Sequence, residues 1–499
     1  MRTKRLNFIL GVFGIWTLLL VFSCTSICFI KGDEYIRNAV VQRKDNIVVK
    51  NHRGKIYDRN SIPLVESHTD TMRLDENGVM NKNDGTEIVP LPVRYSYDSV
   101  ARHLVGYLDS EGRGVYGLEK CFDSVLTGIG KDSVNVVKTA DGRIIEAMGM
   151  SFIDEEYECS SIVLTLDSHI QRIAENSLAN HGVTGAVVIL DTETFDILAM
   201  ASAPNYDQNN IGKHILSDSG EFLNRCLMPY NAGSIFKIIT FSSAVENAKL
   251  RSYYNCSGAL HLGDLTFNCH KADGHGTVSW KDGFSKSCNG AFYTMGLDLG
   301  SDRILDTARR FGLGDTVLYG LDGLGESRGY IPQRGESHGD TLNLSIGQGD
   351  ILLTPLQAAN MVCIIANDGL CGRVDLVSGT RDVDGNTKNL LDGEKYRKVI
   401  SPLASAYVKE CMAQTVLSGT GRILCENPAD ISGKTGTAET GWLKNGQTLV
   451  HGWFCGFFPR ENPKYAMAVL VENGGSGSES AAPIFGEIAE EIIKIYPLG

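Results

Sequence analysis

The sequence predicts an α+β protein: an N-terminal membrane anchor, an elongated mixed domain, and a larger domain with a central antiparallel sheet flanked by helices. Two observations support this fold class. One long apolar run opens the chain, and strand-like segments later alternate with helical ones in clusters instead of in a regular βαβ order. The 499 residues suffice for two or three domains, and the net charge of -12 argues against a nucleic-acid partner.

The anchor is predicted from the first thirty residues. Three basic residues precede an apolar run from Leu6 to Ile30. At about 1.5 Å per residue, this run spans a bilayer core of about 30 Å. Basic residues in front favour a cytoplasmic N-terminus, so we expect a cytoplasmic tail at 1–5, one transmembrane helix at 6–30 and an extracytoplasmic remainder. A cleaved signal peptide is the main alternative, but its apolar region is usually shorter and no small-x-small cleavage site follows this run.

Two domains are expected after the anchor. Residues 31–160 are polar and contain short alternating segments such as NIVVK and SVNVVKTA, which predict an elongated, mixed pedestal domain with a modest core. The character changes in 161–499. There SIVLTLD predicts a strand, HIQRIAENSLAN an amphipathic helix, and GAVVILD with FDILAMAS a hairpin joined at TET.

The rest of the second domain adds helices and two strands. Helices are expected at Ser301 to Phe311 and at Thr354 to Asn367, where Pro355 suits the first turn because its missing N–H is harmless there. HGWFCGFF and KYAMAVLVEN predict strands, and PIFGEIAEEIIKIY predicts a closing helix. These elements complete a sheet flanked by helices.

The stretch YNAGSIFKIITF places Lys237 in an apolar run, three residues after Ser234. On a helix these positions share a face. A buried ammonium without a partner is costly and tends to lose its proton. The simple alternative is a lysine whose stem packs on apolar neighbours while its ammonium reaches water. The other interpretation is a nucleophilic serine with lysine as its base, which needs support elsewhere in the chain.

That support comes from two further motifs, SCN and KTGT, which follow in order. The residues of the three motifs are Ser234 and Lys237 of SIFK, Ser287 and Asn289 of SCN, and Lys434, Thr435, Gly436 and Thr437 of KTGT. Each motif is weak alone, but S-x-x-K, S-x-N and K-T-G in this order are typical of penicillin-binding proteins and class A β-lactamases.

From about Arg53 to its end the chain resembles a class B penicillin-binding protein, a membrane-anchored peptidoglycan D,D-transpeptidase. RGKIYDRNSIPL resembles the R-G-x-I-x-D-R-N-G motif of the family's pedestal, with Ser61 in place of glycine. IGQGDILLTPLQAA and GWFCGFFPRENPKYAMAVLVE resemble its transpeptidase domain. Ala232 and Ile235 stand where the family usually has proline and often threonine; neither side chain supplies chemistry, so we expect intact catalysis.

The resemblance implies a role for each motif. Lys237, neutral because of burial and the nearby charge of Lys434, takes the proton of Ser234. Asn289 binds Lys237 and the substrate amide, and Ser287 relays a proton to the departing D-alanine.

The KTGT strand is implied to bind the donor. Lys434, Thr435 and Thr437 recognise its terminal carboxylate from an edge strand, and Gly436 leaves that strand open to the peptide. The backbone N–H groups of Ser234 and Thr437 form the oxyanion hole. A second stem peptide then attacks the acyl-enzyme, and a β-lactam is trapped at the same serine. No cofactor is needed for this chemistry.

The same resemblance suggests partners. The chain shows no second catalytic module, so we expect a separate glycosyltransferase of the SEDS (shape, elongation, division, sporulation) type to polymerise the lipid-linked precursor. Within enzymes, the alternative function is a hydrolase: a D,D-carboxypeptidase or a β-lactamase. A non-catalytic scaffold or β-lactam sensor is the alternative outside enzymes. The pattern leaves open an elongation, division or sporulation role.

A second constellation lies between the first two motifs and consists of Cys256, Cys269, His275 and Cys288. Three thiolates and one imidazole make a common zinc site, and some elongation-type relatives are similar. A disulfide, Cys256 with Cys269 or Cys269 with Cys288, is the second interpretation, and plain buried thiols are the third. Eleven of the 13 cysteines lie outside the anchor. His270 and His451 are expected to be structural.

Overall fold

The computed structural model describes residues 2–66, 68–74, 80–81, 87–139, 151–153, 158–335, 337–390, 396–444 and 446–497. Its contacts divide the chain into two compact units. The first unit comprises Met1–His52, Ser67–Val93 and Gly128–Glu158, and the second comprises Arg53–Glu66, Arg94–Thr127 and Cys159–Gly499. Residues of the expected pedestal range 31–160 therefore lie in both units.

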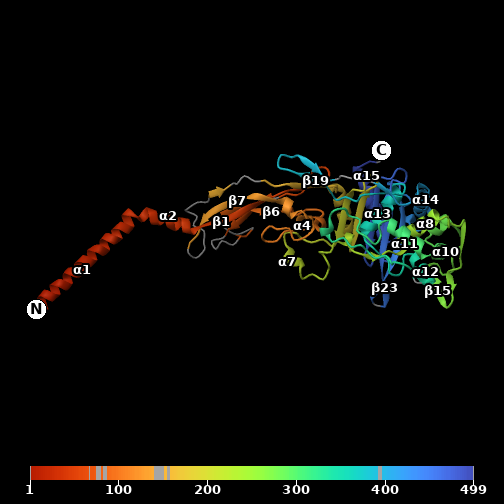
Figure 1. Ribbon diagram of the computed structural model, residues 1–499, viewed down its shortest axis with the longest axis horizontal. Coiled ribbons are helices and arrows are strands. Elements are labelled where there is room, and N and C mark those ends of the chain that lie inside the picture. The colour runs from red at the N-terminus through yellow and green to blue at the C-terminus, as the bar shows by residue number, and fades with distance from the viewer. Residues whose placement is uncertain are drawn as a thin grey trace. The chain divides into compact units, whose positions relative to one another are not determined.

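Helix α1 (Arg2–Thr25) opens the first unit and continues as a π-helical turn, η1 (Ser26–Ile30) (Figure 1). Residues Thr3–Ile30 form a continuous stretch of 28 residues with a mean hydropathy of 2.2, none of it buried against the rest of the chain. In the described part of the chain this is the one helix long and apolar enough to cross a membrane. It coincides with the anchor expected from the sequence.

The rest of the first unit is a short helix, α2 (Gly32–Arg43), and two small sheets. One sheet has the order β1-β7-β8 and the other β5-β4-β6. Their bounds are β1 (Lys44–Arg53), β4 (His68–Leu74), β5 (Met80–Asn81), β6 (Glu87–Val93), β7 (Thr127–Val137) and β8 (Ser151–Ile153). The expected strands NIVVK and SVNVVKTA fall in β1 and β7.

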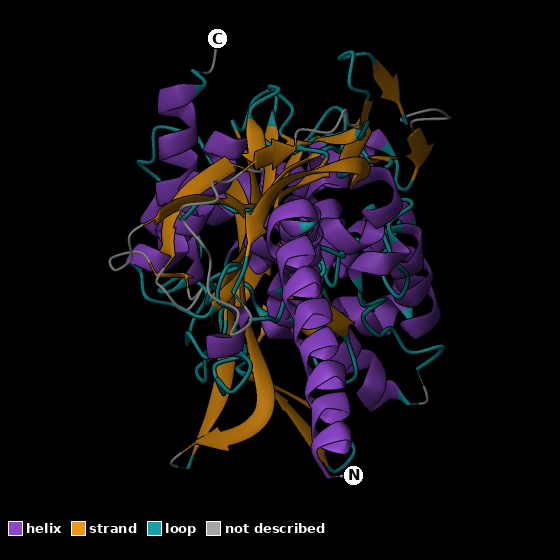
Figure 2. Ribbon diagram, turned by 90° about the vertical axis from the view of Figure 1, so that its left-hand side faces the viewer, coloured by secondary structure: helices purple, strands orange, loops and turns teal. Residues whose placement is uncertain are grey.

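A five-stranded sheet of order β11-β10-β24-β23-β22 lies at the centre of the second unit, and every neighbouring pair is antiparallel. The strands are β10 (Gly185–Asp191), β11 (Ile197–Ala203), β22 (Ser432–Lys444), β23 (Gln447–Phe458) and β24 (Tyr465–Val471). Figure 2 shows helices on both sides of the strands, so the predicted α+β class is confirmed. The second hairpin strand begins at Ile197, two residues later than expected, because Phe195 has a φ of 65°.

The alternation of side chains along each strand separates two cores. On β10, Val187 and Ile189 join the cluster formed with α6 (Ser168–Asn180) and α15 (Ala481–Ile495), whereas Val188 and Leu190 join the larger cluster on the opposite face. Successive side chains of a strand point to opposite faces, so a run of buried residues such as GAVVILD indicates a sheet covered on both sides.

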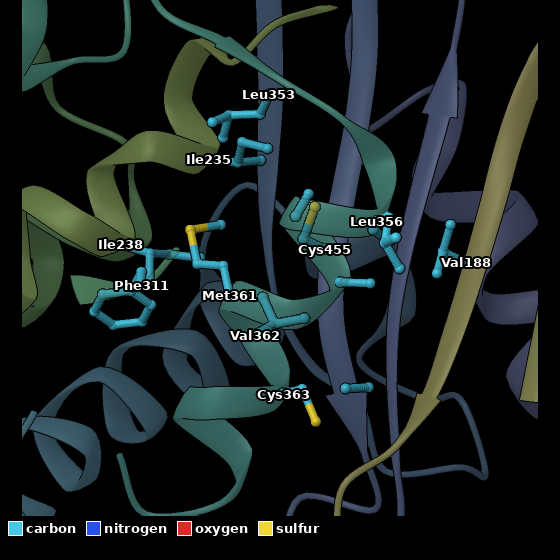
Figure 3. Packing of buried hydrophobic residues seen from close by; sticks show 14 of the residues in the cluster. Val188, Ile235, Ile238, Phe311, Leu353, Leu356, Met361, Val362, Cys363 and Cys455 are labelled. Carbon is cyan, nitrogen blue, oxygen red and sulfur yellow. The ribbon is translucent and has the colours of Figure 1, made fainter. Parts of the chain in front are cut away.

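The larger cluster is built around α13 (Pro355–Ala366), all of whose residues are buried. Thr354 caps this helix in a capping box with Gln357, and Pro355 occupies the first turn as expected. Figure 3 shows Leu356 beside Val188 of the sheet, and Met361 on the other side of the helix, towards Ile238 and Phe311. The helix therefore joins the sheet to the helices that carry the catalytic motifs.

Those helices are mostly short. The elements around the site are η4 (Gly233–Phe236), α8 (Lys237–Glu246), α9 (Trp280–Ser285), α10 (Asn289–Leu299), α11 (Ser301–Arg310), α12 (His338–Ser345) and α14 (Pro402–Ser418). Small strand pairs between them are β12 (Tyr230–Asn231) with β17 (Leu352–Leu353), β13 (Tyr253–Cys256) with β16 (Gly276–Ser279), and β14 (Ala259–Leu262) with β15 (Leu265–Asn268).

A second sheet, of order β20-β19-β9-β2-β3, explains why parts of the expected pedestal belong to the second unit. Its strands are β2 (Ile56–Tyr57), β3 (Pro63–Val65), β9 (Ser161–Leu164), β19 (Val377–Arg381) and β20 (Thr387–Asn389), and β2 runs parallel to β9. Nearby, the fully buried carboxylate of Glu119 forms ion pairs with the guanidinium groups of Arg53 at 2.7 Å and Arg94 at 2.9 Å. This charged centre binds all three segments together, because a buried carboxylate requires such partners.

Candidate active site

The SIFK motif lies at the junction of η4 and α8. Ser234 is in the 3₁₀ turn, and Lys237 is the first residue of α8. Side chains at i and i+3 eclipse in a 3₁₀ turn, so the two residues share a face as expected. In the described part of the chain no hydrogen bond joins the Ser234 hydroxyl to Lys237. Catalytic hydrogen bonds often tighten only when substrate is bound.

Lys237 is completely buried, and its Nζ contacts the SCN motif. It lies 2.8 Å from the Ser287 carbonyl oxygen, 3.1 Å from the Ser287 hydroxyl and 2.7 Å from Asn289 Oδ1. Burial lowers the pKa of this amine to about 7, although the neighbouring Cys288 and Cys269 act in the opposite direction. A neutral Lys237 has one lone pair, which can accept a proton. The idea of a lysine whose ammonium reaches water is therefore wrong for this residue.

Lys434, the second lysine, enters the site from β22 and is also completely buried. Its Nζ lies 3.0 Å from the Ser287 hydroxyl and 3.0 Å from the Thr435 carbonyl oxygen. Burial, and then the charge of Lys237, lower the pKa of Lys434 well below its ordinary value. The Ser287 hydroxyl thus stands between two amines, so a proton can pass along the chain Lys434, Ser287, Lys237.

The SCN turn presents its side chains in two directions. Ser287 adopts a φ of 54°, a left-handed conformation that is unusual for serine and frequent at active sites. Cys288 caps α10, with its sulfur accepting from the Ala291 N–H. Asn289 then faces Lys237 and donates through Nδ2 to the Asn268 carbonyl at 3.2 Å.

β22 is the edge strand of the central sheet, as the KTGT motif requires. Two glycines allow it to approach the serine turn. A Cβ on Gly233 would lie 2.6 Å from the Thr437 carbonyl oxygen, and one on Gly436 would lie 2.9 Å from the Ile235 side chain. Thr437 is exposed on this edge, whereas Thr435 is 6% exposed.

Thr420 is a residue that the sequence analysis missed. It follows α14, and its hydroxyl lies 2.5 Å from the Thr435 hydroxyl. The loop SGTG that contains it has only small residues and no recognisable motif, so nothing in the pattern distinguished it. Thr420 reaches the site only because the end of α14 folds back onto α9: its backbone N–H donates to the Ser285 carbonyl at 3.1 Å.

The four residues of the second constellation come together. The ligand atoms of Cys256, Cys269, His275 and Cys288 lie within 4.8 Å of one another. His275 Nδ1 is 3.7 Å from Cys256 Sγ and 3.5 Å from Cys269 Sγ. A tetrahedral zinc ion with bonds of about 2.3 Å to sulfur and 2.0 Å to nitrogen separates sulfur from nitrogen by about 3.5 Å, so the donor set fits such an ion.

The same four residues are compatible with the other two interpretations. Every cysteine in the chain is a free thiol in the structure. The hydrogen bond between Cys288 and Cys269 lowers the pKa of Cys269 and raises that of Cys288. His270 Nδ1 lies 3.9 Å from Cys269 Sγ, at the margin of the cluster. His451 is inside β23 and its Nδ1 accepts from the Asn473 N–H at 3.2 Å, a backbone contact.

Comparison with known proteins leads to the same family as the motifs. Residues 185–490 match the model of the penicillin binding protein transpeptidase domain. The peptidoglycan D,D-transpeptidase PbpA of Mycolicibacterium smegmatis is 32% identical over 408 residues, which cover 75% of this chain and 79% of that protein. The stage V sporulation protein D of Bacillus subtilis is 28% identical over 419 residues, 80% of this chain and 63% of that protein.

Solved structures agree in fold. Penicillin binding protein 3 from Mycobacterium tuberculosis, complexed with aztreonam, has a TM-score of 0.70 and 26% identity, covering 91% of this chain and 98% of that one. A chain from a structure described as "structural coordination of polymerization and crosslinking by a peptidoglycan synthase complex" has a TM-score of 0.71 and 25% identity, with 98% of both chains covered. The resemblance stated from the motifs is confirmed: this chain belongs to the penicillin-binding protein transpeptidase family.

Proposed function

We propose that this protein is a peptidoglycan D,D-transpeptidase that cross-links stem peptides through an acyl-serine intermediate on Ser234. The observation that carries the proposal is the buried pair of amines, Lys237 and Lys434, on either side of the Ser287 hydroxyl. Among the described residues neither buried lysine has a carboxylate partner, which favours a neutral amine, and a neutral amine is the base that a serine nucleophile needs.

In the first half-reaction, Ser234 Oγ attacks the carbonyl carbon of the penultimate D-alanine, and its proton passes to Lys237. The oxyanion is stabilised by the N–H groups of Ser234 and Thr437. The C–N bond then breaks, and the departing D-alanine takes up a proton through Ser287. Thr435, Thr437 and Lys434 hold the terminal carboxylate of this donor peptide.

In the second half-reaction, the neutral amine of another stem peptide attacks the acyl carbon. Its proton passes to Lys237, the bond from the acyl carbon to Ser234 Oγ breaks, and Ser234 regains a proton. Water in place of the amine gives a D,D-carboxypeptidase, the competing activity. A β-lactam acylates the same serine, because its ring amide resembles the D-alanyl-D-alanine bond.

The surroundings of the reaction are part of the proposal. Thr3–Ile30 serves as a single-pass membrane anchor with the catalytic unit on the extracytoplasmic side. The donor and acceptor are then stem peptides of nascent peptidoglycan made from the lipid-linked precursor. The likeness to a chain of a peptidoglycan synthase complex supports a separate, SEDS-type glycosyltransferase as partner.

We also propose that Cys256, Cys269, His275 and Cys288 hold a structural zinc ion. Bound there, zinc would supply a cross-link between loops and no catalytic chemistry. Cys288 lies between Ser287 and Asn289, so a ligand bond at its sulfur would hold the SCN turn in place. A disulfide between two of these thiols is the competing arrangement.

The experiment is covalent labelling of the full chain in detergent with a fluorescent penicillin. The native protein is compared with Ser234→Ala and with Ser252→Ala, a control at an exposed serine outside the site. We expect stable label on the native protein and on Ser252→Ala and none on Ser234→Ala. No label on the folded native protein would leave a non-catalytic scaffold, and rapid loss of label would indicate a hydrolase.

A further inference from the structure

Tyr293 is a buried residue of the second unit that belongs to none of the three catalytic motifs. It lies on α10, four residues after Asn289, and is only 3% exposed. Side chains at i and i+4 share one face of a helix, so the helix presents the catalytic asparagine and this tyrosine side by side.

Both side chains donate to one backbone carbonyl, that of Asn268, at the end of the β14–β15 hairpin. Tyr293 Oη donates to it at 3.0 Å and Asn289 Nδ2 at 3.2 Å. A carbonyl oxygen has two lone pairs, so it can accept both hydrogen bonds. The ring of Phe267, next to Asn268, packs edge-on against the Tyr293 ring with 5.8 Å between the centroids. The tyrosine thus holds the end of the hairpin, and with it the acceptor that Asn289 uses.

The shared carbonyl determines which end of the Asn289 amide faces Lys237. A carboxamide has an oxygen at one end and an NH2 group at the other, and hydrogen bonding decides between the two orientations. A carbonyl oxygen can only accept, so the Asn268 carbonyl must meet the NH2 end. The oxygen end then faces Lys237, where Oδ1 accepts from Nζ at 2.7 Å.

This orientation leaves the lone pair of the base free. A neutral lysine amine has two N–H bonds and one lone pair. The Ser287 carbonyl, at 2.8 Å, and Asn289 Oδ1 are both acceptors, so together they engage the two N–H bonds of Lys237. In a reversed amide the NH2 group would instead donate to the lone pair and compete with the hydroxyl of Ser234.

We propose that Tyr293 is a positioning residue for the transpeptidase reaction. Through the Asn268 carbonyl, its hydroxyl keeps Asn289 oriented so that the lone pair of Lys237 can accept the proton of Ser234. The inference rests on the proposed acyl-serine function and deepens it, because it adds a side chain and a hairpin carbonyl from outside the three motifs.

The test measures acylation of the full chain in detergent by a chromogenic cephalosporin over a range of concentrations. The saturating rate and the half-saturating concentration are thereby obtained separately. The variants are Tyr293→Phe, Asn289→Ala and the double variant. Tyr206→Phe is the matched control, because Tyr206 is also buried and its hydroxyl also donates to a backbone carbonyl, that of Arg102, at 2.9 Å.

We expect Tyr293→Phe to lower the saturating rate about fivefold, as for the loss of one hydrogen bond, and to change the half-saturating concentration less. In the Asn289→Ala background the same substitution should have no further effect on the rate, because no amide is left to orient. Tyr206→Phe should be acylated at the native rate.

A fivefold loss in both the native and the Asn289→Ala backgrounds would overturn the proposal, because the tyrosine would then act independently of Asn289. A native saturating rate in Tyr293→Phe would overturn it as well. Melting temperatures show whether each variant is folded at the temperature of the measurement. No acylation of the native protein would instead contradict the proposed function itself.

Discussion

The serine–lysine centre and the cysteine–histidine cluster share the turn Ser287-Cys288-Asn289 but are built differently. Lys237 and Lys434 come from a helix and a strand of the core and are completely buried. In the cluster, Cys256 comes from the end of the two-stranded β13–β16 ladder, and Cys269 and His275 come from the loop between β15 and β16. A catalytic group must be held rigidly by packing, whereas loop residues can be held by a metal ion or a disulfide.

The two sides of the Ser287-Cys288-Asn289 turn therefore have different roles. Ser287 and Asn289 face the amines, and Cys288 faces the cluster. Substitutions of the two lysines should therefore lower the acylation rate with little loss of stability. Substitutions in the cluster should lower stability with little effect on the acylation rate. Four variants and one pH profile test this division of roles.

The largest effect is expected from Lys237→Met. Acylation by penicillin should slow about 10³-fold, because the variant lacks the base. The melting temperature should stay the same or rise, since methionine fills the space without burying an amine. Lys249→Met, at an exposed lysine just after α8, is the matched control. A Lys237→Met protein acylated at the native rate would remove lysine from the mechanism.

Gly436→Ala should slow acylation about a hundredfold, the cost of a displacement on the order of 1 Å at a reacting centre. The new Cβ would meet the Ile235 side chain at 2.9 Å and Trp453 Cβ at 3.0 Å, so β22 must move away from the serine turn. Stopped-flow measurement with a chromogenic cephalosporin would show it. Gly441→Ala, on the same strand with open space around it, is the comparison, although its φ of 75° adds some strain.

The rate of acylation should depend on pH in one direction. Burial lowers the pKa of Lys237 to about 7, so the amine is neutral and able to accept a proton above that pH. The rate should fall about tenfold per pH unit below 7 and level off above it. A rate that instead rises as pH falls would mean that the protonated lysine is the active form.

Cys288→Ser tests the other side of the turn. The serine oxygen can still cap α10, so the helix start should survive. One thiolate is lost from the cluster, and zinc affinity should fall by more than about tenfold, with a lower melting temperature. Cys425→Ser, at an exposed cysteine, should change neither. Metal analysis that finds no zinc in native protein purified under reducing conditions would exclude the zinc proposal.

The smallest effect is expected from Thr420→Val. This variant removes the hydroxyl bonded to Thr435 and should weaken acylation about fivefold, which corresponds to about 1 kcal/mol for one hydrogen bond. Thr440→Val, farther along β22, serves as the control because its hydroxyl donates to the Leu449 carbonyl and accepts the Trp442 N–H, both outside the site. An effect of equal size in both variants would indicate a general disturbance of the strand.

Much of the fold could be predicted because local patterns there agree with the tertiary structure. The apolar run before Ile30, the capping box of Thr354 with Gln357 and the buried run of β10 each express a local or near-local preference. The pedestal boundary could not be predicted from such patterns. Arg53, Arg94 and Glu119 are far apart in sequence, and only their packing shows that they form one buried charged centre.

The motifs show which chemical groups the chain carries: two lysines, two serines and an asparagine in a fixed order, and three cysteines with a histidine between them. How these groups meet depends on the packing of the folded chain. It brings Lys434 to Ser287, gives Ser287 its left-handed backbone and places Thr420 beside Thr435. The physical reason is that motif spacing records local geometry, whereas contacts across hundreds of residues and the lowered pKa of a buried amine arise only when packing excludes water.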